Sequence, residues 1–186
     1  VQGANSFAVD IDLGNENTYK NMVSYYKKLG YYDTGIFATD IVTRLLFENG
    51  DTDLAIDLLT HDGDQGFEHW RKNGATTFHE YWDSNRSRPH SHPMFGAPVA
   101  YLFEYLLGIR QEDSSAGYKS LIIEPQGIHR FKTMSGSITT PNGIVSVTYM
   151  NDDGNVRFII TIPENTKAVF RYKNEEITLT QGENKF

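Results

Sequence analysis

The spacing of apolar residues changes once along this chain, near residue 118, and this change limits the fold more than any other feature. Up to about residue 110, apolar side chains recur every three or four positions, which is the period of an amphipathic helix. Beyond residue 118 they recur at every second position, as in strands that bury one face. The sequence therefore predicts an α+β protein of two parts, the first helical and the second built from strands.

The helical part should consist of hairpins, because the links between its apolar stripes are short. Gly30 can end the second helix, and Asp51 or Thr52 can cap the fourth. Pro98 falls in the first turns of the last helix, where its missing N–H does least harm. The interval from 61 to 93 breaks the rhythm and is expected to be irregular. Helices are expected near residues 1–11, 18–29, 36–46, 52–59 and 94–108.

The second part is predicted to be a small antiparallel β-sandwich, because its strands are short and closely spaced. Asn142-Gly143 and the run from Asn151 to Gly154 are typical hairpin turns. These turns carry no cluster that suggests catalysis, so we expect a packing or stabilising role. Strands are expected at residues 137–140, 144–150, 156–162, 168–172 and 177–180.

Charge and composition exclude several functions. The 186 residues carry a net charge of −7 without a basic cluster, which argues against a nucleic-acid partner. The most apolar run, 94–103, ends at Glu104 and is shorter than the ~20 residues that cross a bilayer, so no membrane segment is expected. Without cysteine there is no disulfide framework. The first residues show neither an initiator Met nor a signal-peptide pattern, so a piece of a longer protein is expected, cytoplasmic or exported.

The stretch GATTFHEYWDS places one glutamate, Glu80, among Phe78, His79, Tyr81 and Trp82. A carboxylate between aromatic side chains is costly unless it is hydrogen-bonded, neutralised or used in chemistry. A glutamate that binds sugar and transfers protons would explain the arrangement. An ordinary glutamate that points outward from an aromatic-rich edge explains the residue types equally well and is the more common case.

Two of the histidines are candidate metal ligands. His90 and His92 lie on one face if their segment is extended, and Glu80 could join them. The chain has no HExxH pattern and no glutamate a few residues after the histidine pair, so neither a metal nor another cofactor is expected. His69 and His79 flank aromatic residues and can be explained as packing residues.

Paired carboxylates are the remaining candidate chemistry. Glycoside hydrolysis normally needs two, one to protonate the leaving oxygen and one to act as nucleophile or to activate water. Glu80 can serve as one of them, whereas Asp83 is better explained as a turn or capping residue. No second group is identified. The other carboxylates of the helical part lie near helix ends, where capping explains them: Asp33, Asp40, Glu48, Asp51 and Asp53.

Five stretches, in order along the chain, match the pattern of one enzyme family. They are VQGANSFAVDIDLG, TGIFATDIVTRLLFENGDTDLAIDLL, GATTFHEYWDS, SHPMFGAPVAYLFEYLLGIR and GYKSLIIEP. The third is similar to the family's GATTxWExWD, and the fourth resembles its NHxxFGSVxEWLYxxxAGI. On these motifs the chain resembles the C-terminal part of bacterial α-L-rhamnosidases, glycoside hydrolase family 78. After Pro125 the resemblance rests on position and strand pattern alone.

The resemblance implies two domains and a reaction. Residues 1–112 would form the C-terminal portion of an (α/α)6 catalytic barrel, and residues 113–186 a C-terminal β-sandwich. The family hydrolyses terminal α-L-rhamnose from glycosides with inversion and without a metal. The glutamate of GATTxWExWD is its general base, which corresponds to Glu80. The histidine before xxFG contacts the sugar, which corresponds to His92.

Three further residues are expected to shape the sugar site. Trp82 matches the aromatic residue of the motif and is expected to line the pocket, and Trp70, just before the motif, is a further lining candidate. His79 stands where the family usually has Trp, and Ala97-Pro98 where it usually has Ser-Val. These departures leave the strict preference for rhamnose open, although His79 can contact the substrate or tune Glu80.

The family's general acid and sugar-gripping acidic cluster lie upstream of the stretches matched here. The missing N-terminal part of the same enzyme is therefore the expected partner, besides a rhamnose-containing glycoside or polysaccharide. The chain alone is expected to bind sugar weakly and to turn over none. Two alternatives stay open: a non-catalytic carbohydrate-binding or assembly module, and another (α/α)6 barrel hydrolase such as an unsaturated glucuronyl hydrolase.

Overall fold

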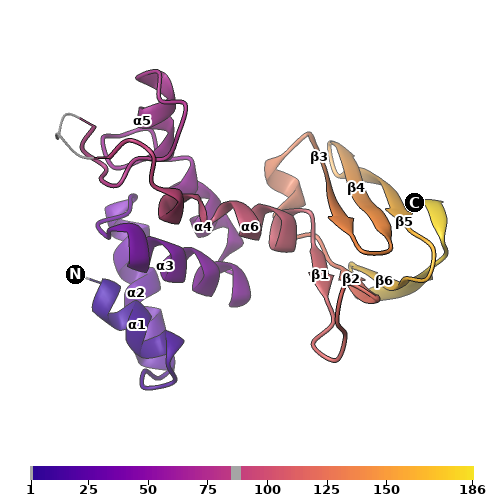
Figure 1. Cartoon of the computed structure of the whole chain (residues 1–186). Coiled ribbons are helices and arrows are strands. Elements are labelled where there is room, and N and C mark those ends of the chain that lie inside the picture. The colour runs from indigo at the N-terminus through magenta and orange to yellow at the C-terminus, as the bar shows by residue number, and fades with distance from the viewer. Residues whose placement is uncertain (1, 85–88) are drawn as a thin grey trace. The chain divides into compact units, whose positions relative to one another are not determined.

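The structure is a computed structural model that describes residues 2–84 and 89–186. Its contacts divide the chain into two compact units, Val1–Val99 and Ala100–Phe186, called here the helical unit and the β unit. Figure 1 shows helices α1 to α5 in the helical unit and the labelled strands in the β unit. The predicted order of helical hairpins followed by a β-sandwich is confirmed.

The first four predicted helices are all present. A capping box begins the second: the Asn15 side chain accepts from the Thr18 N–H at 3.1 Å, and the Thr18 hydroxyl accepts from the Asn15 N–H at 3.2 Å. Gly30 ends the same helix with φ of 80°, a left-handed conformation that glycine adopts without steric cost. The helices are α1 (Gly3–Asp10), α2 (Glu16–Leu29), α3 (Ile36–Glu48) and α4 (Thr52–Leu59).

Helix α3 is the centre of the helical unit, because it contacts α1, α4 and the 3-10 helix η1 (Pro93–Gly96). Its fully buried side chains include Val42 and Leu46, and α2 contributes Met22 and Tyr26. Burying an aliphatic side chain of this size contributes roughly 1.5–3 kcal/mol, so burial of these side chains stabilises the unit far more than helix propensity does.

Two segments of the helical part differ from expectation. The interval 61–93 is not wholly irregular, since α5 (Phe67–Lys72) forms within it. The expected continuous helix over 94–108 is divided into η1, α6 (Val99–Tyr101) and the π-helix η2 (Leu102–Leu106). Pro98 lacks the N–H that a continuous helix needs, and the Leu107 N–H donates to Leu102 in the wider π pattern at 3.0 Å. Among helices built from described residues, none has the length and apolarity to cross a membrane.

The β unit contains two four-stranded sheets. Strands β4 and β5 alternate as predicted, and Val147 pairs with Ile160 in their antiparallel register while both side chains are fully buried. One pairing, β2 with β6, is parallel, and all other pairings are antiparallel. The first sheet consists of β1 (Ile109–Gln111), β2 (Ser120–Ile123), β6 (Lys167–Tyr172) and β7 (Glu175–Leu179). The second consists of β3 (Thr133–Thr140), β4 (Gly143–Asp152), β5 (Asn155–Ile162) and β8 (Gly182–Lys185).

Candidate functional site

The helical unit contains a cleft of about 630 Å³ that Glu80 helps to line, called here the Glu80 cleft. Most of its lining comes from the link between α2 and α3, the first turn of α3 and the segment 80–82. Single residues of α1, η1 and the loop before α5 complete it. The lining residues are Phe7, Asp33, Thr34, Gly35, Ile36, Phe37, Ala38, Gln65, Glu80, Tyr81, Trp82 and Phe95. A cleft of this volume can hold a monosaccharide.

Backbone hydrogen bonds hold Glu80 at the edge of this cleft. The Glu80 N–H donates to the Pro89 carbonyl at 3.1 Å, and the His92 N–H donates to the Phe78 carbonyl at 2.7 Å. The Thr77 hydroxyl also donates to the His90 carbonyl, so segments 77–80 and 89–92 lie side by side. The Glu80 side chain is half-buried, and within residues 2–84 and 89–186 its carboxylate has neither a hydrogen-bond donor nor an ion-pair partner.

Trp82 anchors the same segment to the start of α3. Its indole N–H donates to the Thr34 carbonyl at 2.7 Å, and its ring stacks on Tyr32 at 6.1 Å with an interplanar angle of 4°. Trp70 also contacts Trp82: the two indole rings stack at 5.0 Å, and the Trp70 N–H donates to the Trp82 carbonyl at 3.0 Å. Trp82 therefore lines the cleft beside Glu80, whereas Trp70, only 3% exposed, supports it from within the unit.

His79 is part of a different cavity. Its ring is 7% exposed and lies between Trp70 at 5.0 Å and His90 at 4.2 Å. Burial lowers the pKa of His79, and the positive charge that His90 can carry lowers it further, so the neutral imidazole is favoured. A neighbouring cavity of about 470 Å³, called here the histidine cavity, is lined by His79, Trp70 and His90 among others. His79 Nδ1 is buried and has no hydrogen-bond partner among residues 2–84 and 89–186.

His92 does not line the Glu80 cleft either. Its side chain is half-buried, and its Nδ1 is buried without a hydrogen-bond partner in the part of the chain that the structure describes. Of the predicted site residues, the structure thus brings together Glu80 and Trp82 in one cleft. It places Trp70 and His79 around the histidine cavity, and it leaves His92 joined to the Glu80 segment by the backbone bond to Phe78.

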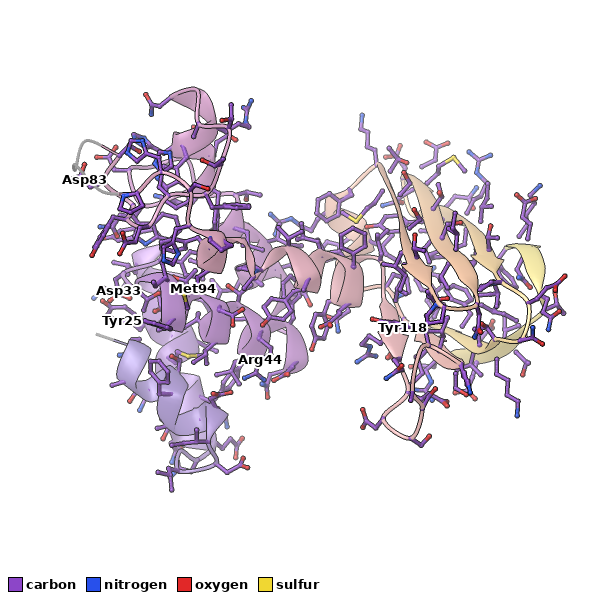
Figure 2. The ribbon with its side chains drawn as sticks, viewed as in Figure 1. Tyr25, Asp33, Arg44, Asp83, Met94 and Tyr118 are labelled. Carbon is purple, nitrogen blue, oxygen red and sulfur yellow. The ribbon has the colours of Figure 1, made fainter. Side chains whose placement is uncertain are left out.

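Asp33 was missed by the sequence argument, which explained it as a capping residue. The N-cap of α3 is Gly35, and no described side chain caps that helix, so capping does not account for Asp33. Its carboxylate instead accepts from the Tyr25 hydroxyl at 2.8 Å and from the Tyr26 hydroxyl at 2.9 Å. Asp33 lines the Glu80 cleft, and Figure 2 shows it close to Tyr25. The adjacent Tyr-Tyr pair in α2 was the signal that could have identified it.

The charges of the Glu80 cleft limit its ligands. Its described lining includes two carboxylates, Asp33 and Glu80, and neither lysine nor arginine. Carboxylates accept hydrogen bonds from hydroxyl groups but repel anions, so the cleft suits a neutral polyhydroxylated ligand better than an anionic one. Within the described ranges, no group of three or more His, Cys, Asp or Glu is arranged to hold a metal ion.

Comparison with known proteins identifies the family of the chain. Residues 1–106 match the bacterial alpha-L-rhamnosidase 6 hairpin glycosidase domain, and residues 108–185 match the bacterial alpha-L-rhamnosidase C-terminal domain. An alpha-L-rhamnosidase of Formosa agariphila is 30% identical over 146 residues, which are 76% of this chain and 15% of that protein. The matched part of the chain thus spans only about 15% of the length of that relative.

Solved structures share the fold. The alpha-L-rhamnosidase of Aspergillus terreus matches with a TM-score of 0.88 and 21% identity, covering 100% of this chain and 23% of that one. The Streptomyces avermitilis alpha-L-rhamnosidase complexed with L-rhamnose matches with a TM-score of 0.82 and 21% identity, covering 91% of this chain and 18% of that one. The two family matches together cover nearly all residues, and the chain belongs to the bacterial α-L-rhamnosidase family.

Proposed function

We propose that this chain forms part of an inverting glycoside hydrolase that releases terminal α-L-rhamnose, with Glu80 as the general base. The observation that carries the proposal is the Glu80 carboxylate itself, which lines an aromatic-walled cleft and has no partner within the described residues. A general base needs a carboxylate that is free to accept a proton from water near its target. A relative of the same fold was solved in complex with L-rhamnose, which supports the choice of sugar.

The remaining site residues have distinct proposed roles. Trp82 forms part of the aromatic wall of the cleft beside Glu80, and Trp70 holds Trp82 in place from behind. His92 contacts a sugar hydroxyl, which requires a ligand that extends beyond the described lining of the cleft. His79 keeps a neutral, buried ring directly before Glu80 and shapes the approach to it.

A second carboxyl group completes the reaction in this proposal. Inverting glycosidases place their acid and base roughly 6.5–9.5 Å apart, leaving space for the attacking water. The general acid is supplied by the preceding part of the same enzyme, so the 186-residue chain alone binds rhamnose weakly and does not turn it over. The lack of a cation among the described residues of the cleft disfavours an anionic uronide, and with it the unsaturated glucuronyl hydrolase alternative.

The proposal is tested by replacing Glu80→Gln in the full-length polypeptide that carries this chain, with an aryl α-L-rhamnoside as substrate. Loss of a general base should lower kcat by roughly 10²–10⁴-fold and change KM little. Glu68→Gln is the matched control, because Glu68 is a half-buried glutamate of the same unit that pairs with Arg71 outside the cleft. Proton NMR of the first product tests inversion, since β-L-rhamnose must appear before the α anomer.

A rise in KM with unchanged kcat would instead support a non-catalytic carbohydrate-binding role. Full activity of the Glu80→Gln enzyme would refute the assignment of the base. Turnover by the purified 186-residue chain would refute the proposal that the acid lies outside it.

A further inference from the structure

Asp33 is the second carboxylate of the Glu80 cleft, and nothing in the proposed chemistry uses it. Its two oxygens are engaged separately: Oδ2 accepts from the Tyr25 hydroxyl at 2.8 Å and Oδ1 from the Tyr26 hydroxyl at 2.9 Å. Tyr26 is fully buried and lies edge-on against Tyr25 at 5.5 Å, so both donors are held by packing. A carboxylate gripped in this way has a fixed orientation.

The two tyrosines remain hydrogen-bond donors over any working pH. Its hydrogen bond to Asp33 raises the pKa of Tyr25, and burial followed by the charge of Asp33 raises the pKa of Tyr26. Both hydroxyls therefore stay protonated and donate, and the carboxylate of Asp33 accepts. An ionised carboxylate has about four acceptor positions, so two hydrogen bonds leave about half of its capacity for a ligand.

The position of Asp33 relative to Glu80 is also fixed. Thr34, the next residue, accepts the Trp82 indole N–H at 2.7 Å, and Tyr32, the preceding residue, stacks on the Trp82 ring. Asp33 is thus flanked on both sides by contacts to the segment that carries Glu80. Both carboxylates line the same cleft, so a ligand that reaches one of them lies within the space bounded by the other.

We propose that Asp33 is a sugar-binding residue, which accepts hydrogen bonds from hydroxyl groups of the terminal sugar and sets its orientation relative to Glu80. This inference rests on the proposed function and adds a specificity-determining residue to it. Hydroxyl groups that donate to an ionised carboxylate form charge-assisted hydrogen bonds, which are stronger than bonds between neutral groups. Asp33 transfers no proton in this role.

The test compares Asp33→Asn with wild type in the full-length polypeptide, on aryl α-L-rhamnoside and on its 2-deoxy, 3-deoxy and 4-deoxy analogues. Asp33→Asn should raise KM for the parent substrate, and the Kd of L-rhamnose, roughly 10- to 100-fold, with a smaller change in kcat. Removing one particular hydroxyl should weaken binding to the wild-type enzyme, but the same removal should weaken binding to the Asp33→Asn enzyme much less, because that hydroxyl and the Asp33 carboxylate are partners. Equal deoxy penalties on both proteins would overturn the inference.

Asp51→Asn is the matched control. Asp51 also accepts from a tyrosine hydroxyl, that of Tyr19 at 2.8 Å, but it lies outside the lining of the Glu80 cleft. The Asp51→Asn enzyme should lose stability as the Asp33→Asn enzyme does, but its KM should equal that of wild type. Where Asp33→Asn does not fold, Tyr25→Phe replaces it, because it removes one of the two donors that orient Asp33; an unchanged KM for Tyr25→Phe would overturn the inference.

The two proposals fail separately. If the wild-type enzyme does not hydrolyse the rhamnoside, the proposed function fails, and the Kd of L-rhamnose measured by NMR titration still decides the role of Asp33. If wild type turns over and Asp33→Asn behaves like Asp51→Asn, only the role of Asp33 fails.

Discussion

The anchor formed by Trp82 should be a major source of stability for the helical unit, and Trp82→Phe tests it. The substitution removes the indole N–H that donates to the Thr34 carbonyl at 2.7 Å. Thr34 is only 5% exposed, and its carbonyl would keep one donor, the Thr39 hydroxyl at 3.2 Å, so losing the indole N–H should cost about 0.5–1.5 kcal/mol. The smaller ring also weakens the stacking on Tyr32 and Trp70, which adds about 1 kcal/mol. We expect a total loss of about 1.5–2.5 kcal/mol.

Urea unfolding followed by tryptophan fluorescence measures this loss. The chain has two tryptophans, Trp70 and Trp82, and both belong to the helical unit, so the emission of Trp70 in the variant reports on that unit. Tyr32→Phe is the control, because it keeps a ring against Trp82 and removes only the hydroxyl that shares a 2.7 Å hydrogen bond with Thr43; it should cost about 1 kcal/mol. If Trp82→Phe costs no more than Tyr32→Phe, the anchor does not stabilise the unit as argued.

Two further predictions concern the pH dependence of the helical unit and one glycine of the β unit. Because the pKa of His79 is lowered in the folded unit, the unfolded chain binds more protons below about pH 6.5 than the folded chain does. The free energy of unfolding should therefore fall as the pH is lowered from about 7 to about 5, and His79→Phe should flatten that slope in urea titrations. Gly108→Ala should destabilise the β unit by about 2–4 kcal/mol in thermal unfolding followed by circular dichroism, because Gly108 has φ of 73° and an added Cβ would lie 2.2 Å from the Glu124 carbonyl carbon. Gly154→Ala, with φ of 93° and no atom within 4 Å, should cost only about 1 kcal/mol.

Periodicity in the sequence was enough to predict the long elements of this fold. Helix α3 and strand β4 repeat their apolar positions over many residues, and both were predicted because a repeated period identifies a buried face. Strands β1, β2 and β8, of three or four residues, were not predicted, because so short a run carries no measurable period. The break at Pro98 was underestimated, since the apolar pattern continues across it while the backbone hydrogen bonds do not.

The candidate site was predictable only where its chemistry was local in sequence. Glu80 and Trp82 were selected because they share one short motif, and both line the cleft. Asp33 was not selected, because its role depends on hydroxyls of the preceding helix and on a cleft shared with a segment far along the chain. Capping was the nearest local explanation for an aspartate before a helix, and only the observed N-cap, Gly35, removes it.

The two carboxylates of the Glu80 cleft differ in a way that follows from their neighbours. Placing two negative charges in one cleft without a cation among its described lining is unfavourable unless at least one charge is stabilised by hydrogen bonds. Asp33 has that stabilisation from two tyrosine hydroxyls, which also fix its orientation, so it is suited to bind a ligand and unsuited to move a proton. Glu80 lacks such donors within the described residues, so a water molecule can be its hydrogen-bond partner, and water is the nucleophile that an inverting hydrolase must activate.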